Sequence, residues 1–328
     1  MVERFVLQWH LSENCNLKCL HCYQEKHNPI QLEFEKLKLF YNQFKILLDK
    51  LQMNGHINIT GGEPLCNPYL FKILDLIKED HEKISFSILT NGTLITKEIA
   101  KKIKSYNPYY VQVSLEGGKR INDYIRGDGT YKKIGEAIKI LRREDIFTSV
   151  SFTANKLNYK EFPKVVNYAK KCKANNVWSD RYIPLGESED KELALNFEET
   201  QEYFEIMNKT KNMQKRSKTT ISMNRALQFL KTNDFAYGCT AGDTLLTIME
   251  NGDLVPCRRM PIVVGNLTNK EMCDLYENNE VLKELRAKKI PEDCKKCEYS
   301  ETCRGGLKCL SYATCGNWNI KDIGCNII

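Results

Sequence analysis

The chain lacks the features that carry a protein into or across a membrane. None of its apolar runs approaches the ~18 consecutive residues that indicate a membrane-spanning helix. Its first residues, MVERFVLQWHLSENC, lack the order of basic, apolar and small residues found in a secretory signal peptide. We therefore expect a cytoplasmic protein that has no membrane partner.

Features for binding nucleic acid are also missing. The net charge of +7 is modest, and such a charge spread over many lysines is typical of a solvated surface. The densest basic stretch, residues 209–218 (KTKNMQKRSK), contains no aromatic side chain that could stack on a base. We expect no nucleic acid partner, although this stretch could attract an acidic peptide.

Cysteine, in contrast, is abundant, with 14 residues. The cytosol keeps thiols reduced, which argues against disulfides. Most of these cysteines stand in short, regular spacings, which argues against a role as simple core residues. Metal binding is the remaining common use of so many cysteines.

Short apolar runs alternate with helical patterns over roughly the first two hundred residues. The spacing of apolar residues thus changes repeatedly between a period of 2 and a period of 3.6 residues, which predicts βαβ units and a parallel sheet. Six such units predict an α/β fold, a partial (β/α)6 barrel of the TIM type, because a full barrel needs about 250 residues. We expect strands at 5–11, 57–60, 85–90, 110–114, 148–153 and 178–183, and helices at 33–51, 69–79, 96–106, 131–142 and 160–173.

The alternation stops at Phe197. Two stretches that look helical, 197–208 and 222–232, lead to a region from Cys239 onward that holds nine of the 14 cysteines and few apolar runs. A segment so poor in core-forming residues needs metal to fold. We expect a barrel over 1–195, a helical linker over 196–235 and a small cysteine-rich domain over 236–328.

Cys15, Cys19 and Cys22 form a C-x3-C-x2-C pattern directly after the first expected strand. Ligand sites of α/β sheets and barrels lie beyond the carboxyl ends of strands, so the position suits chemistry. A [4Fe–4S] cluster takes four ligands, and three thiolates from one loop would leave one iron open. The spacing alone permits zinc equally well.

Four further elements follow this loop in the chain, and with it they carry a resemblance. The stretch CNLKCLHCY (15–23) resembles the signature of the radical S-adenosylmethionine (SAM) superfamily, including the aromatic Tyr23 after the third cysteine. The later elements resemble that superfamily's motifs in order. They are Gly61-Gly62-Glu63-Pro64 (GGEP), Asn91 in T-N-G, Ser114-Leu115-Glu116-Gly117 (with glutamate for the usual aspartate), Arg126 in N-D-Y-I-R-G and, more weakly, Leu185 in Y-I-P-L-G at 182–186.

The resemblance implies that the open iron binds the amino and carboxylate groups of SAM. The GGEP motif would bind the amino group, and its glycines would let the backbone approach the ligand closely. Tyr23 and Leu185 would lie near the adenine, Ser114 near the ribose or carboxylate, and Arg126 against the carboxylate. In the superfamily, electron transfer cleaves SAM to methionine and a 5′-deoxyadenosyl radical, which abstracts a hydrogen atom from the substrate.

The remaining cysteines form a second pattern. Cys239 and Cys257 are spaced C-x12-G-x4-C around an Asn251-Gly252 turn, which predicts a hairpin that begins with a strand at 245–249. Downstream stand Cys294, Cys297 and Cys303, spaced C-x2-C-x5-C, and then Cys309, Cys315 and Cys325. This order resembles the SPASM extension of radical SAM enzymes, which holds two auxiliary iron–sulfur clusters.

Carried over, the resemblance assigns Cys294, Cys297, Cys303 and Cys325 to the second auxiliary cluster, and Cys239, Cys257 and Cys309 to most of the first. The gap between Cys303 and Cys309 is five residues instead of three, and no cysteine shortly precedes Cys239. Cys315 could complete the first site, or the site could stay open or hold a [2Fe–2S] cluster. Zinc ribbons are the alternative, since C-x2-C-x5-C also permits zinc.

Family members with this domain pair mostly modify peptides or proteins, so we expect a maturase that installs an oxidative crosslink in a ribosomally made peptide. Auxiliary clusters suit such oxidations, because the substrate radical must lose an electron. Sulfatase-maturase-like formylglycine formation is one alternative, but those enzymes carry an aspartate base where this chain has Arg258. Maturation of a tetrapyrrole or quinone cofactor is another. The intact GGEP motif and Arg126 argue against a non-catalytic electron-transfer protein.

The expected partners are a peptide or protein substrate and a reductant of the flavodoxin or ferredoxin type. Many peptide maturases have an N-terminal leader-binding domain, whereas this sequence starts at its first barrel strand. We therefore expect a separate leader-recognition protein, a short leader or a non-peptide substrate. The sequence nominates no catalytic acid or base, and Cys66, Cys172 and Cys273 are expected to be ordinary residues.

Counting iron tests the cluster assignments. We expect about twelve irons in the anaerobically reconstituted protein and about eight when Cys15, Cys19 and Cys22 are all replaced by alanine, given four irons in each cubane. A fall from about ten to about six would indicate a [2Fe–2S] first auxiliary site. Zinc in place of the remaining iron would contradict the SPASM assignment.

Overall fold

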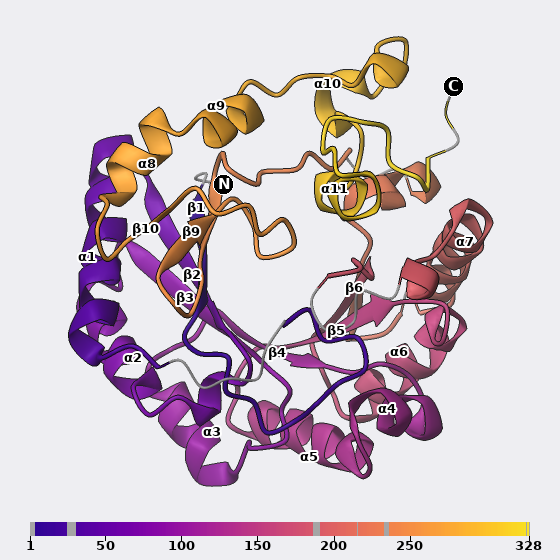
Figure 1. The fold of residues 1–328 in the computed structure, drawn as a ribbon. Coiled ribbons are helices and arrows are strands. Elements are labelled where there is room, and N and C mark those ends of the chain that lie inside the picture. The colour runs from indigo at the N-terminus through magenta and orange to yellow at the C-terminus, as the bar shows by residue number, and fades with distance from the viewer. Residues whose placement is uncertain are drawn as a thin grey trace.

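The structure is a computed structural model that describes residues 4–24, 31–185, 191–214, 216–232, 236–325 and 327 (Figure 1). Within these ranges, no helix is both long and apolar enough to cross a bilayer. The described residues form one ten-stranded sheet, with helices on its outer side and a cysteine-rich segment at its far end.

Six parallel strands form the core of the sheet, in the order in which they occur along the chain. They are β1 (Arg4–His10), β2 (Asn54–Thr60), β3 (Ile84–Thr90), β4 (Tyr110–Ser114), β5 (Thr148–Ala154) and β6 (Asn176–Arg181). The outer helices are α1 (Phe34–Leu51), α2 (Leu70–Glu79), α3 (Lys97–Lys104), α4 (Lys119–Arg126), α5 (Thr130–Arg143), α6 (Phe162–Lys171) and α7 (Phe197–Met213). The partial (β/α)6 barrel is thereby confirmed.

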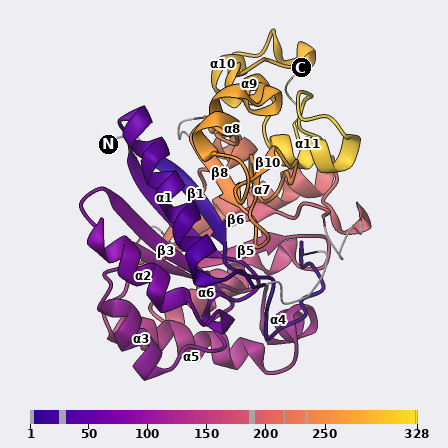
Figure 2. The ribbon, with the colours of Figure 1, turned by 60° about the vertical axis from the view of Figure 1, so that its left-hand side comes forward.

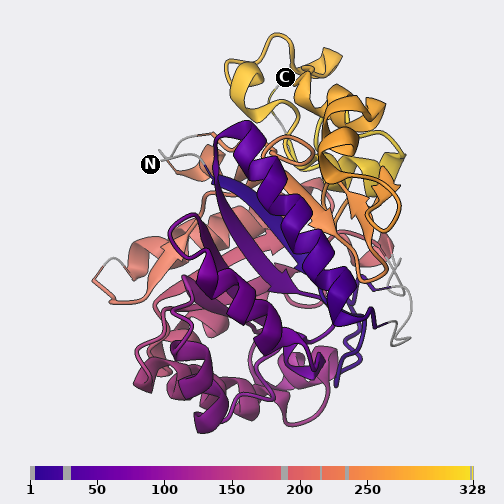
Figure 3. The ribbon, with the colours of Figure 1, turned by 90° about the vertical axis from the view of Figure 1, so that its left-hand side faces the viewer.

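Helix α1 illustrates how the sequence specifies the outer layer. Its buried residues include Leu37, Phe40, Phe44 and Leu47, which recur three or four positions apart and therefore lie on one face. That face packs on the sheet, and Figure 3 shows α1 running along the outer side of β1 and β2. The exposed face is mostly charged but also presents Leu39 and Ile46 to solvent.

One expected helix is wrong. Residues 222–232 form the end of a short strand, β7 (Thr220–Ser222), and a 3-10 helix, Ala226–Lys231. Tertiary contacts override the helical pattern here, because the Gln228 side chain donates to the carbonyl of Ser179 at 2.8 Å and the Arg225 side chain reaches Asp180. Strand β7 pairs in parallel with β6 and extends the barrel by one strand.

The expected hairpin is confirmed, and its position adds a new feature. Strands β8 (Leu245–Ile248) and β9 (Asp253–Val255) pair antiparallel around a turn in which Gly252 has φ +89°. Strand β8 also pairs in parallel with β1, and the short strand β10 (Gly265–Asn266) pairs with β9. The sheet thus continues across the expected domain boundaries at 195 and 235, which stay predictions.

The rest of the C-terminal segment consists of short helices joined by loops. These are α8 (Met272–Asn278), α9 (Glu280–Arg286), α10 (Ser300–Cys303) and α11 (Lys308–Cys315), and Figure 2 shows them gathered over one end of the barrel. The buried Gln43 side chain of α1 anchors this segment, since it accepts from the amide of Met272 and donates to the carbonyl of Leu267.

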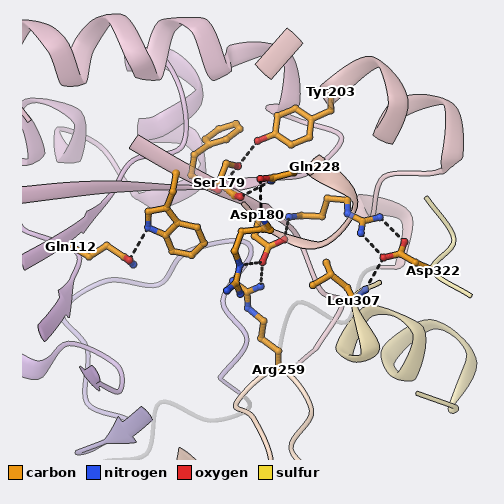
Figure 4. A network of polar contacts seen from close by, with 12 residues as sticks. Gln112, Ser179, Asp180, Tyr203, Gln228, Arg259, Leu307 and Asp322 are labelled. Carbon is orange, nitrogen blue, oxygen red and sulfur yellow. Dashed lines mark hydrogen bonds and ion pairs between the residues drawn. The ribbon is translucent and has the colours of Figure 1, made fainter. Parts of the chain in front are cut away.

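A buried ion pair ties the end of β6 to the C-terminal loop (Figure 4). Arg181 donates to both carboxylate oxygens of Asp322, at 2.8 and 2.6 Å, and both side chains are almost fully buried. Asp322 also accepts from the amides of Leu307 and Gly324. Its carboxylate is therefore surrounded by donors from three separate parts of the chain.

Replacing Asp322 with asparagine should lower the free energy of unfolding by about 3–5 kcal/mol, because Arg181 would keep a buried charge without a counter-ion. Urea unfolding of the reconstituted protein measures the change. Asp243→Asn is the matched control, since Asp243 pairs with the half-exposed Lys288 and its loss should cost about 1 kcal/mol or less. Equal losses in the two variants would contradict this account.

Candidate active site

The loop that carries Cys15, Cys19 and Cys22 follows β1 at the carboxyl end of the sheet. Two backbone hydrogen bonds join it to the loop after β2, from Gly62 N to Ser12 O at 2.8 Å and from Glu63 N to Asn14 O at 2.9 Å. All three thiols line one cavity of about 160 Å³. The structure therefore brings the three expected ligands of the SAM-binding cluster together at one site.

The glycine pair of the GGEP motif is required by the backbone of the thiol loop. A Cβ at Gly61, whose φ is +137°, would lie 2.5 Å from the carbonyl oxygen of Ser12. A Cβ at Gly62 would lie 2.4 Å from that of Asn14. The close approach that requires these glycines is therefore to the backbone of the thiol loop. Both glycines also line the cavity, and their expected contact with SAM stays a prediction.

Glu63 lies beneath the cavity and joins two motifs. Its side chain is fully buried and accepts from the Thr90 hydroxyl at 2.7 Å, the Asn91 amide at 2.8 Å and the Leu65 amide at 3.2 Å. Burial raises the pKa of Glu63, although these hydrogen bonds oppose that shift. Pro64 is buried and begins the short 3-10 helix Pro64–Cys66. The expected role of this motif toward the SAM amino group stays a prediction.

Glu116, which replaces the usual aspartate, forms the centre of a buried charge cluster. Its carboxylate accepts from Arg126 Nη2 at 2.6 Å and from the Thr153 amide at 2.9 Å, and it lies 3.3 Å from His21 Nε2. Burial alone would raise the pKa of Glu116, but the charges of Arg126 and His21 outweigh it and hold the pKa at about 2. Glu116 thus fixes the position of Arg126.

Arg126 connects this charge cluster to the thiols. Its Nη1 atom lies 3.8 Å from Cys19 Sγ, and its Nε atom is buried without a hydrogen-bond partner among the described residues. Tyr23, Ser114 and Leu185 line the same cavity, and the Tyr23 hydroxyl lies 3.5 Å from the carbonyl oxygen of Gly61. Asn91 lies 3.8 Å from Cys15 Sγ. Gly186, the end of the weakest motif, lies outside the described residues.

The residues at this site fit the cluster and SAM. Three thiols from one loop can supply three of the four ligands of a [4Fe–4S] cluster. Beside them, the buried and unpaired Arg126 Nε and His21 Nδ1 offer nitrogen atoms that lack a partner within the described chain. The chain thus supplies three ligands of the cluster, which leaves one iron open for SAM, and polar groups remain for a bound anion.

Two further sets of cysteines are gathered in the C-terminal segment. Cys239, Cys257 and Cys309 line a second cavity, of about 530 Å³, inside the barrel, which reaches the amino ends of β4 and β6 at Tyr110 and Asn176. Cys294, Cys297, Cys303 and Cys325 line a small cavity of about 20 Å³ between the 3-10 helix Ala226–Lys231 and α10. These are the two sets expected for the auxiliary clusters, and their roles as ligands stay predictions.

The other cysteines lie apart from these sets. Cys315, the candidate fourth ligand of the first auxiliary cluster, is exposed at the end of α11 and lines none of the three cavities. Cys172 is buried after α6, and Cys273 is half-buried at the start of α8. Cys66 is half-buried near Glu63, and burial raises the pKa of its thiol.

No three His, Cys, Asp or Glu side chains within the described ranges converge closely enough to hold a single metal ion. A tetrahedral zinc site, with Zn–S bonds of about 2.3 Å, holds its thiolates about 3.8 Å apart. An iron–sulfur cluster distributes its ligands over several irons, so its thiols need not converge on one point.

Sequence reasoning missed several polar residues of the site. His21 lies between two expected ligands and bonds Glu116, yet its spacing gives no sign of that contact. Asp180, at the end of β6, binds Arg259 at 2.6 Å and Arg225 at 3.2 Å. The doubled arginine after Cys257 was the available signal, because residues next to an expected cluster ligand are expected to lie close to that site.

Comparison with known proteins gives relatives that match nearly the whole chain. The AdoMet-dependent heme synthase of Methanosarcina barkeri is 25% identical over 98% of this chain and 95% of that protein. Mycofactocin maturase MftC of Mycobacterium tuberculosis is 24% identical over 94% of this chain and 79% of that protein. The solved structure of native anSMEcpe with bound AdoMet and Cp18Cys peptide superposes on this chain with a TM-score of 0.79 at 20% sequence identity. The match covers 98% of this chain and 94% of that one, so the two proteins have the same fold.

Replacing Glu116 with glutamine should lower the free energy of unfolding by about 3–5 kcal/mol, because Arg126 would be left as a buried charge without its counter-ion. Glu205→Gln, at an exposed helix position paired with Lys231, is the matched control and should cost about 1 kcal/mol or less. Urea unfolding of the two variants compares them. A loss below about 1 kcal/mol for Glu116→Gln would show that this pair does not hold the site together.

Family comparison agrees with the motifs and the fold. Residues 9–169 match the radical SAM superfamily, and residues 239–298 match SPASM, an iron–sulfur cluster-binding domain. The first match covers the thiol loop and Arg126, and the second begins at Cys239. The two domains together imply SAM and iron–sulfur clusters as cofactors. The chain is a radical SAM enzyme with a C-terminal SPASM domain.

Proposed function

We propose that this enzyme installs an oxidative crosslink in a ribosomally made peptide, using one SAM-binding cluster and two auxiliary clusters. The observation that carries the proposal is the meeting of two cavities inside the barrel. The cavity of the SAM site and the cavity of the first auxiliary site are both lined by Leu89, Gln112, Trp178, Arg258 and Arg259. A substrate lying there would touch both sites.

Such a shared space suits a reaction that needs both sites in turn. When bound, the clusters and SAM supply the radical that removes a hydrogen atom from the substrate and an acceptor for the electron that the substrate then loses. Cys15, Cys19 and Cys22 would hold the first cluster, and Arg126 would orient the SAM carboxylate. Cys239, Cys257 and Cys309 would hold the first auxiliary cluster, and Cys294, Cys297, Cys303 and Cys325 the second.

The walls between the two cavities would orient the substrate and keep water away from it. Trp178 donates its indole N–H to Gln112 Oε1 at 2.9 Å, which fixes the indole ring between the two cavities. Tyr23 is held on the other side by Arg258, whose Nη1 donates to its hydroxyl at 2.8 Å. These rigid aromatic walls favour a substrate segment that threads past the SAM site.

The relatives support modification of a peptide, and they favour one alternative. MftC is named as a maturase, and anSMEcpe was solved with a bound peptide. The heme synthase of M. barkeri matches this chain over a greater length, so maturation of a tetrapyrrole is the second candidate. Formylglycine formation is disfavoured, because Arg258 occupies the position of the expected base and faces the SAM cavity.

The electron that starts the reaction would come from a flavodoxin- or ferredoxin-type protein. Recognition of the peptide would use a short leader or a separate leader-recognition protein. We place the reaction in the cytoplasm, where thiols stay reduced and the cluster ligands remain available.

Anaerobic turnover tests the proposed function. The reconstituted enzyme is incubated with SAM, dithionite and short peptides encoded beside its gene. We expect release of 5′-deoxyadenosine, together with a peptide product that has lost two hydrogen atoms, as mass spectrometry detects. Cys19→Ala should abolish both products, and Cys273→Ala, a thiol outside the three sets, should retain them.

Each other outcome identifies a different function. If SAM is not cleaved by the wild type, the chain is a non-catalytic iron–sulfur protein. Fe-coproporphyrin III is the tetrapyrrole in the name of another relative, a synthase of M. barkeri that is 35% identical over 49% of this chain and 39% of that protein. If SAM is cleaved and the peptides stay unchanged while Fe-coproporphyrin III is converted, the enzyme acts on a tetrapyrrole.

A further inference from the structure

We propose that the substrate presents a carboxylate group to Arg258 and to the neighbouring Arg225 and Arg259, between the SAM site and the first auxiliary site. This inference rests on the proposed function and specifies the chemistry of its substrate. It starts from three arginines that line the interior of the barrel.

Two of the three arginines share a single acid. Asp180 Oδ2 lies 2.6 Å from Arg259 Nη1 and 3.2 Å from Arg225 Nε (Figure 4). The Asp180 side chain is buried, and the side chains of Arg225 and Arg259 are largely buried. One carboxylate therefore compensates two cations.

The third arginine has no acidic partner within the described part of the chain. Arg258 is half-buried, and its Nη1 atom donates to the hydroxyl of Tyr23, a neutral group. Its guanidinium lies 4.8 Å from the centroid of the Tyr23 ring. Its Nε atom is buried and has no hydrogen-bond partner in the described ranges. Arg258 thus faces the cavity with a charge that no described carboxylate neutralises.

These charges cannot be removed by deprotonation, because a guanidinium stays protonated in proteins. Burying a cation costs free energy unless an anion and hydrogen bonds compensate it. Among the described carboxylates, Asp180 alone bonds these arginines, and it bonds Arg225 and Arg259. The thiols of Cys239, Cys257 and Cys309 line the same cavity and would add negative charge as cluster ligands, but they leave the buried Arg258 Nε without a hydrogen-bond partner in the described ranges. An anionic group of the substrate would supply the missing partner.

A carboxylate matches this site best. The guanidinium presents its N–H donors as a planar fork, which binds a carboxylate with two parallel hydrogen bonds. A peptide carries such groups on Asp, on Glu and at its C-terminus. A tetrapyrrole carries them as propionates. The site selects the shared group, and binding experiments distinguish its two sources.

Isothermal titration of the anaerobic holoenzyme with SAM, and without reductant, tests the inference. The probes are an acetylated and amidated tetraglutamate peptide, the corresponding tetraglutamine peptide and Fe-coproporphyrin III. We expect the tetraglutamate peptide to bind the wild type about tenfold tighter than the tetraglutamine peptide, and Arg258→Gln to remove most of that difference. Arg258→Lys should keep part of it, because the charge remains and the fork is lost.

Arg143→Gln, at an exposed position of α5, is the control for the loss of one positive charge. It should leave the affinity for the tetraglutamate peptide within about twofold of the wild type, because charges across solvent are screened. Iron content measured on every variant corrects for incomplete cluster loading.

The outcomes separate this inference from the proposed function. If only Fe-coproporphyrin III binds and Arg258→Gln weakens it, the carboxylate site stands and peptide maturation fails. If Arg258→Gln changes the affinity for neither acidic probe, the carboxylate site is overturned. It is also overturned if the two peptides bind with equal affinity and Arg258→Gln leaves the affinity for the tetrapyrrole unchanged.

Discussion

The pairing of β1 on both of its edges is the interaction on which the rest of the molecule depends. β2 pairs with one edge and β8 with the other, and both pairings are parallel. Phe5, Leu7 and Trp9 are consequently fully buried within the sheet. Because parallel strands end at the same rim, the thiol loop after β1 and the GGEP loop after β2 meet there. The hairpin that starts with β8 runs back antiparallel through β9, and its last residues, Cys257 and Arg258, line the cavity inside the barrel.

Buried carboxylates at this rim convert the sheet into a site. Glu63 joins two SAM motifs through backbone and hydroxyl donors, and Glu116 holds Arg126 beside Cys19. Asp180 and Asp322 bind arginines at the junction with the C-terminal segment. A buried charge is tolerated only where donors surround it, so each carboxylate fixes the position of its partners as firmly as a packed side chain would.

Much of the fold could be predicted from the sequence, because apolar residues recur along the barrel strands in short runs and the outer helices have clear periodicity. The motifs likewise located Arg126 and the thiols that line each cavity. Strand β7 was not predicted because three residues are too few to show a hydrophobic period. Helix α4 was not predicted because its residues were interpreted only as a SAM-binding motif. The β1–β8 pairing and the Asp180–Arg225 contact could not be predicted, since they join segments that are distant in the chain and leave no local pattern.

The pairing of β8 with β1 also has a consequence for the order of folding. Thr247 bonds Gln8 across a sequence separation of 239 residues, so the edge of the sheet closes only after most of the chain has left the ribosome. Contacts of such long range form slowly, and until then β1 exposes an unpaired edge next to the thiol loop. Cluster delivery during this interval would meet an accessible loop, whereas delivery afterwards would meet a half-buried one. The stage of folding at which the cluster is inserted, and not only the identity of its ligands, thus affects how this enzyme is assembled.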